Sequence, residues 1–94
     1  MGGFPSVELL EAHHAFPGPY MFKAIGRTEN GFVARTVAAV RDELAEPFDP
    51  PYRVRETGAG HYVAITLEVQ VQTAMQVLAV YKRMAGLAGL KLLF

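Results

Sequence analysis

The chain has 94 residues, which is enough for one small domain. Hydrophobic residues make up 51% of the chain, so we expect a folded core. Nine basic side chains balance nine acidic ones, which argues against a general nucleic-acid binder, because such proteins carry a basic excess. Cysteine is absent, which excludes disulfides, thiolate metal sites and a cysteine nucleophile.

The sequence predicts a cytoplasmic protein that makes no contact with a membrane. No apolar run approaches the roughly 20 residues that a membrane-spanning helix needs. The N-terminus lacks the basic start and the apolar core of a signal peptide. The absence of cysteine also fits a reducing compartment.

Residues 1–18 are rich in glycine and proline, and we expect them to form an N-terminal arm with a short helix. Residues 19–94 are expected to form a single domain. Its first strand runs from Tyr20 to Arg27, with Tyr20, Phe22 and Ala24 on the core side because the alternate side chains include a lysine. Gly26 would end the strand or allow a helix to approach closely.

Residues 31–45 predict a helix, because valines and a leucine recur at the spacing of one helical face. Thr28 or Asn30 is expected to cap its N-terminus, and Pro47 to stop it. A hairpin follows: a strand over 52–56, a glycine-rich turn over 57–60 and a strictly alternating strand over 62–71. A second helix is expected over 72–86, where Thr73 and Gln76 have the spacing of a capping box, and a last strand over 90–94.

This β-α-β-β-α-β order predicts an α+β, ferredoxin-like sandwich, with a four-stranded antiparallel sheet and two helices on one face. The other face of the sheet would be uncovered. It is expected to carry Met21, Lys23, Ile25, Arg53, Arg55, Ala64, Thr66, Glu68 and Lys91.

Three segments resemble the YbeD-like proteins, a family of small, uncharacterised bacterial proteins. They are "FPGPYMFKAIG" at residues 16–26, "GHY" at residues 60–62 and the "VAITLEV" that follows. The resemblance covers the chain from about Phe16 to the C-terminus. It implies a ferredoxin-like fold similar to the ACT-type regulatory domains of amino-acid metabolism, and it implies no activity.

No catalytic residue, metal ligand set or cofactor site is expected. "GRTENGFVAR" faintly resembles the anion-binding loop of acylphosphatases, with Arg27 or Arg35 as the anion ligand. Those enzymes need an asparagine on the second strand, and Asn30 lies in the wrong element. His13 and His14 are adjacent and point apart, whereas a metal-binding pair needs a shared face.

The uncovered sheet face offers another alternative, because RNA-recognition motifs share this topology and stack bases there. Only Tyr62 is available for stacking, so nucleic-acid binding is disfavoured, although Lys23, Arg53 and Arg55 would form a local positive patch. An ordinary cross-strand pair of Lys23 with Glu68 would neutralise part of that patch.

We therefore expect a non-enzymatic regulatory or interaction module that acts as a homodimer, through the open face or the exposed final strand. It would bind a small metabolite or a partner protein. By analogy with ACT-type domains, a metabolite would bind at residues 26–31, where backbone donors, Gly26 and Arg27 meet an anionic group. A partner protein would contact Lys23, Arg53 and Arg55.

Overall fold

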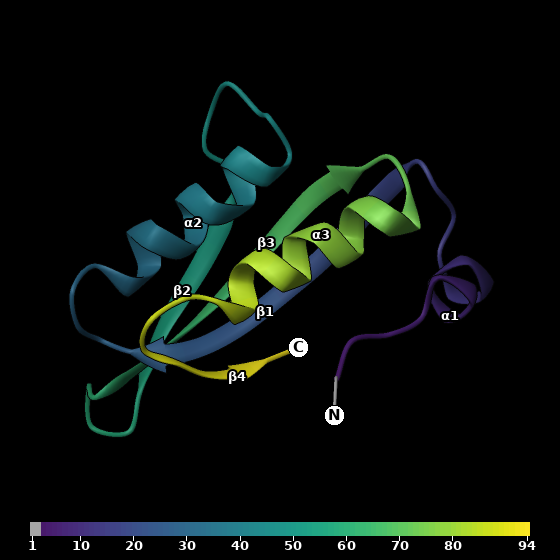
Figure 1. Cartoon of the computed structure of the whole chain (residues 1–94). Coiled ribbons are helices and arrows are strands. Elements are labelled where there is room, and N and C mark those ends of the chain that lie inside the picture. Colours follow the sequence, from purple (N-terminus) through teal and green to yellow (C-terminus); the bar gives the residue numbers. More distant parts are fainter. Residues whose placement is uncertain (1–2) are drawn as a thin grey trace.

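The computed structural model of the chain describes residues 3–94, so residues 1–2 of the expected arm lie outside the described part. Figure 1 shows two of the three helices across one face of a sheet and the third helix to one side. In chain order the elements are α1 (Val7–His13), β1 (Gly18–Arg27), α2 (Phe32–Glu43), β2 (Tyr52–Thr57), β3 (Tyr62–Val71), α3 (Ala74–Ala85) and β4 (Leu90–Leu93).

The four strands form one sheet in the order β2-β3-β1-β4, and every neighbouring pair is antiparallel. The central strands β1 and β3 pair over ten residues each, with Phe22 opposite Leu67 and Lys23 opposite Thr66. Together with α2 and α3 on one face, this topology is the ferredoxin-like α+β fold, so the prediction of the fold is confirmed.

The core lies between the sheet and the two helices that cover it. Alternate side chains of the central strands point into it, and Phe22, Ala24, Ile65 and Leu67 are fully buried. The expected valine stripe of α2 and the apolar face of α3 pack against them, including Val37, Val40, Val77, Val80 and Met84. The alternation read from the sequence therefore identified the core face correctly.

The two long helices begin differently. The prediction for α3 is confirmed, because the Thr73 hydroxyl accepts a hydrogen bond from the Gln76 amide at 3.1 Å. The prediction of a Thr28 or Asn30 cap for α2 is wrong. Gly31 holds the cap position with a φ of 67°, and the Thr28 hydroxyl instead donates to the Gly60 carbonyl at 2.6 Å.

The N-terminal segment packs on α3 and on the start of β1. Leu10 of α1 is buried in the core, and the ring of Phe4 stacks on Tyr81 with 5.7 Å between centroids. The hydroxyls of Tyr20 and Tyr81 lie 3.0 Å apart in a hydrogen bond, and His14 contacts the Tyr20 ring. An aromatic cluster thus joins this segment to the domain.

Gly26 on β1 leaves room for a ring at the start of α2. A Cβ added to Gly26 would overlap the Phe32 side chain, which is itself buried. The glycine therefore permits the close approach of strand and helix that the sequence suggested.

We expect Gly26→Ala to lower the free energy of unfolding by about 1–3 kcal/mol, because the Phe32 ring must move within a packed core. Urea denaturation measures the change. Gly86→Ala is the matched control, since the nearest neighbour of its added Cβ is the Arg83 carbonyl at an ordinary 3.6 Å. Equal midpoints for the two variants would contradict the close packing at Gly26.

The stability of the fold should also depend on pH through Tyr81. Burial first, and then the hydrogen bond with Tyr20, raise the pKa of the Tyr81 phenol above its ordinary value. The unfolded chain then loses this proton at lower pH than the folded chain does. The stabilising contribution is fully present below about pH 10, the ordinary pKa of tyrosine, and is lost as the pH rises further.

Tyr81→Phe should therefore make the fall in unfolding free energy above about pH 10 less steep. Urea melts at a series of alkaline pH values measure the slope. Tyr52→Phe, at an exposed tyrosine of β2, is the control and should keep the slope of the unaltered protein. The same slope in all three proteins would show that Tyr81 is not the responsible group.

Candidate functional site

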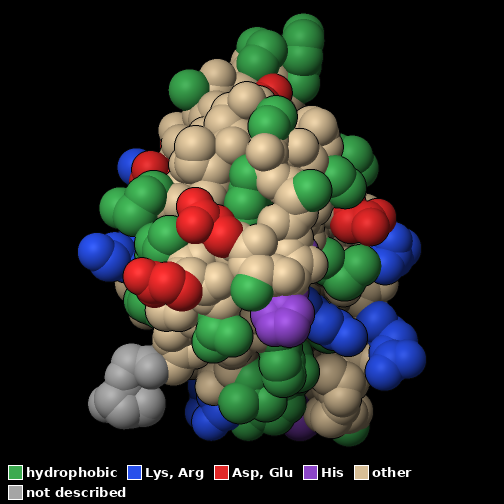
Figure 2. Space-filling model, turned by 90° about the vertical axis from the view of Figure 1, so that its right-hand side faces the viewer, with side chains coloured by type: hydrophobic (Ala, Val, Ile, Leu, Met, Phe, Trp, Pro, Cys, Tyr) green, Lys and Arg blue, Asp and Glu red, His purple; other side chains and the backbone are tan. Residues whose placement is uncertain are grey.

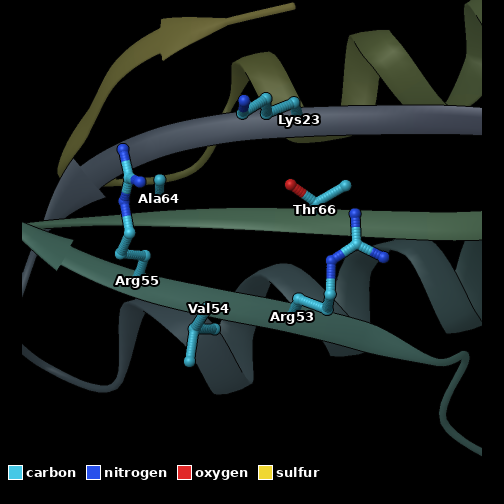
Figure 3. A pocket seen from close by; sticks show the side chains of 6 residues that line it. All are labelled: Lys23, Arg53, Val54, Arg55, Ala64 and Thr66. Carbon is cyan, nitrogen blue, oxygen red and sulfur yellow. The ribbon is translucent and has the colours of Figure 1, made fainter.

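The face of the sheet opposite α2 and α3 holds a shallow hollow of about 370 Å³. Figure 3 shows Arg53 and Arg55 extending from β2 across β3 in the direction of Lys23 on β1, whereas Val54 points the other way. The lining residues are Lys23, Arg53, Val54, Arg55, Ala64 and Thr66. We call the group of Lys23, Arg53 and Arg55 the cationic surface.

The register explains why these side chains meet. Arg53 pairs with Thr66 and Arg55 with Ala64, and on the other side of β3 Thr66 pairs with Lys23. Because alternate residues of a strand point to the same face, three cations from two strands come to lie around two small β3 side chains. The structure thus brings together the three residues expected to contact a partner.

Little negative charge offsets the cationic surface. The closest carboxylate is that of Glu68, whose Oε1 lies 3.9 Å from Arg53 Nη1, and both side chains are more than half exposed. Such an exposed pair contributes little to stability. In the part of the chain that the structure describes, neither Lys23 nor Arg55 forms an ion pair. The side of the molecule that carries α1, by contrast, mixes acidic and basic side chains (Figure 2).

The expected pair of Lys23 with Glu68 is not formed, so this prediction is wrong. The register places Glu68 opposite Met21, two residues away from the Thr66 that faces Lys23. Glu68 instead pairs with Arg53 on β2. Lys23 therefore remains available at the surface.

A second group of cations lies at the other end of the same face. The guanidinium carbon of Arg27 lies 6.0 Å from the centre of the Tyr62 ring, and the Lys91 ammonium lies 5.9 Å from it. Ile25 and Leu92 form the apolar floor beside them. Arg27 is thus held on an aromatic ring and separated from the cationic surface.

The start of α2, expected as a metabolite site, is poorly suited to an anion. Gly26 is buried against Phe32 and does not reach the surface. Glu29 and Glu56 line the adjoining hollow and would repel a negative ligand. Most nearby backbone donors are already used: the N–H groups of Arg27, Thr28, Glu29 and Phe32 donate to the carbonyls of Gly89, His61, Arg27 and Glu29.

Arg35, offered by the sequence as an anion ligand, is engaged in the fold. Its guanidinium donates to the Asn30 carbonyl at 2.8 Å and to the Ala88 carbonyl at 3.0 Å, with a longer contact to the Glu29 carbonyl. These bonds join the start of α2 to the loop before β4. Arg35 is therefore a structural residue, and the arrangement does not support acylphosphatase chemistry.

Sequence reasoning gave no role to Phe48. The structure leaves 80% of this side chain exposed in the loop between α2 and β2. A phenylalanine between prolines in a loop was the available signal, but the pattern does not reveal whether such a ring is buried.

Among residues 3–94, no group of three or more histidines and carboxylates is placed to hold a metal ion. Within the same residues, no helix has the length and hydrophobicity needed to cross a bilayer.

The fold and the surface define a ferredoxin-like domain with one helix-covered sheet face and one open, locally cationic sheet face. A family model described as "Protein of unknown function (DUF493)" matches residues 11–94, so the chain belongs to the DUF493 family. The resemblance to the YbeD-like proteins is thereby confirmed.

Curated relatives carry names without a function. A UPF0250 protein of Shewanella woodyi is 31% identical over 84 residues, and a UPF0250 protein of Shewanella sp. strain ANA-3 is 29% identical over 84 residues. Each alignment covers 89% of both chains. The solution structure of protein HP0495 from H. pylori superimposes with a TM-score of 0.65 at 9% identity, covering 100% of this chain and 98% of that one. At that identity the likeness supports the fold alone.

Replacing Arg35 tests whether it is a structural residue. We expect Arg35→Ala to lower the free energy of unfolding by about 1–2 kcal/mol, because two short hydrogen bonds are lost and one of them joins α2 to the distant Ala88 carbonyl. Arg55→Ala is the control and should change it by less than about 0.5 kcal/mol, since Arg55 is exposed. Both are measured by urea denaturation, and an Arg35 variant as stable as the control would contradict the structural role.

Proposed function

We propose that this protein is a non-enzymatic regulatory or interaction module, and that its cationic surface binds an anionic group. The observation that carries the proposal is the convergence of Lys23, Arg53 and Arg55 on one hollow. The chain is neutral overall, so this local excess of positive charge is not a consequence of composition. Arginine suits such a surface because its planar guanidinium can bind a carboxylate or phosphate through two hydrogen bonds.

The hollow supports binding better than catalysis. Catalytic groups commonly show perturbed pKa values within a cleft. The groups with a raised pKa here are Tyr81, in the aromatic cluster, and Arg41, next to Asp42 on α2. Neither lies on the cationic surface. A shallow hollow with charged and small side chains favours recognition of a partner molecule.

The proposed regulatory unit is a homodimer. The half of the open face formed by β1 and β4 exposes Met21, Leu92 and Phe94, each about half accessible to solvent. β4 is also an edge strand, and its free backbone groups can pair with another strand. These features support association of two copies through the β1–β4 half, with Arg53 and Arg55 of β2 left outside.

The ligand class can be tested by thermal shift against amino acids, nucleotides and acyl phosphates. A ligand at a hundred times its Kd stabilises the fold by about 2.7 kcal/mol. In a domain of this size the melting temperature should then rise by roughly 10 °C or more.

The double variant Arg53→Glu with Arg55→Glu should lose the shift while remaining folded, because both side chains are exposed. Lys82→Glu, at an exposed cation of α3 on the other side of the molecule, is the matched control and should keep it. A shift that survives the double variant would place the ligand elsewhere. A panel without any shift would contradict the version in which the anion is a small metabolite.

A further inference from the structure

We propose that the occupant of the cationic surface is an acidic, amphipathic segment of a partner protein, and that Phe48 anchors the apolar side of this segment. The inference rests on the proposed function and narrows it to one partner chemistry. Neither the family description nor the sequence pattern gives a role to the exposed ring next to the cations.

Phe48 is the most exposed of the large apolar side chains in the described chain, at 80%. A single surface Leu or Val needs no explanation, but an aromatic ring held almost entirely in water is unfavourable by its transfer free energy. Phenylalanine, like tyrosine and tryptophan, is enriched in the buried centre of protein–protein interfaces.

The loop that carries Phe48 is held in place by specific bonds. Arg41 at the end of α2 forms ion pairs with Asp49 at 2.9 Å and with Asp42 at 3.0 Å. The Glu46 amide donates to the Arg41 carbonyl at 3.0 Å. Three prolines, at positions 47, 50 and 51, restrict the backbone further. A ring presented from an ordered loop binds with a smaller entropic cost than one on a flexible loop.

Glu68 links the neighbourhood of Phe48 to the cationic surface. A hollow of about 310 Å³ beside Phe48 is also lined by Glu68, Val69 and Gln70 of β3. Glu68 is in turn the ion-pair partner of Arg53, which lines the central hollow. A segment lying along the β2 side of the open face would therefore meet Phe48 first, then Arg53, and then Arg55.

The charges around Phe48 favour a protein over a nucleic acid. Glu46 and Asp49 flank the ring in sequence, and Glu68 lines the same hollow. A nucleic acid carries phosphates along its whole backbone and would bring negative charge against these carboxylates, whereas an amphipathic peptide can place its apolar side chains there. Tyr62, an aromatic residue of the open face, already has Arg27 and Lys91 beside its ring. An open, shallow surface with an aromatic anchor and arginines matches the composition of protein interfaces.

The spacing of Arg53 and Arg55 sets the spacing of the carboxylates that the partner segment must present. Residues two apart on a strand are separated by about 7 Å, so Arg53 and Arg55 can bind carboxylates at a similar separation. Glutamates four residues apart on one helical face have that approximate spacing. An acidic helix with leucines beside its glutamates would place carboxylates on the arginines and apolar carbons on Phe48.

The test uses the full chain and a fluorescein-labelled, twelve-residue peptide that repeats Glu-Glu-Leu-Leu, with binding followed by fluorescence anisotropy. We expect the affinity to fall as salt is added. The double variant Arg53→Glu with Arg55→Glu should abolish binding, and Phe48→Ala should weaken it about tenfold or more, as for an anchor residue. Lys82→Glu and Met75→Ala, an exposed cation and an exposed apolar residue of α3, are matched controls and should bind normally.

Other outcomes would overturn the inference. A labelled oligothymidylate that binds in place of the peptide would identify the surface as a nucleic-acid site. Equal peptide binding by Phe48→Ala and the unaltered protein would show charge attraction without an anchor. If the peptide fails while a small anion raises the melting temperature through Arg53 and Arg55, this inference is wrong and the proposed function stands. If neither the peptide nor a small anion binds, both this inference and the proposed function are wrong.

Discussion

The pairing of β1 with β3 is the constraint on which the rest of the molecule depends. These central strands align over ten residues, and the same register that places Phe22 opposite Leu67 in the core places Lys23 opposite Thr66 on the open face. A slip of one residue would exchange the faces, burying Lys23 and exposing Phe22. The core therefore fixes the position of the surface cations, although they contribute little to stability themselves.

A sheet covered on one face must make its other face compatible with water. The two long helices of this chain pack on the same face, so β2 and the open side of β1 and β3 remain exposed. Arginines at positions 53 and 55 of the edge strand β2 discourage pairing with the edge of another sheet. The cationic surface thus has a structural reason to exist, and the binding role that we propose for it would use side chains that the fold already tolerates.

The sequence was sufficient for the order of elements and for the core face, because period-two and helical spacings are local properties. The sequence was insufficient where a side chain hydrogen-bonds to a segment that is distant along the chain. The Thr28 hydroxyl bonds to Gly60 in the hairpin turn and so does not cap α2, and Arg35 bonds to Ala88 in a loop far along the chain. A local sequence pattern does not identify hydrogen-bond partners that lie far along the chain.

In the candidate site, too, local patterns predicted some features, whereas others depend on distant segments. Alternation alone placed Lys23, Arg53 and Arg55 on one face, which the structure confirms. Predicting the ion-pair partner of Glu68 requires the register between β2 and β3. That register depends on the length and backbone conformation of the turn at residues 58–60. The exposure of Phe48 depends on how its loop packs, and a proline-rich pattern does not determine that packing.

The two proposed associations use different edges of the open face and are therefore compatible: the dimer would form through β1 and β4, and the acidic segment would bind to Arg53 and Arg55 of β2. If two copies met with their open faces fully opposed, Arg53 and Arg55 would be buried in the contact, and the removal of these charges from water would oppose the dimer. Contact through Met21, Leu92 and the β4 edge avoids that cost, because β3 separates β1 and β4 from β2. A dimer formed in this way would leave the Arg53 and Arg55 side chains of both copies exposed, each pair with its own Phe48. An acidic partner with two binding segments could then engage both surfaces, and its apparent affinity would exceed that of either surface alone.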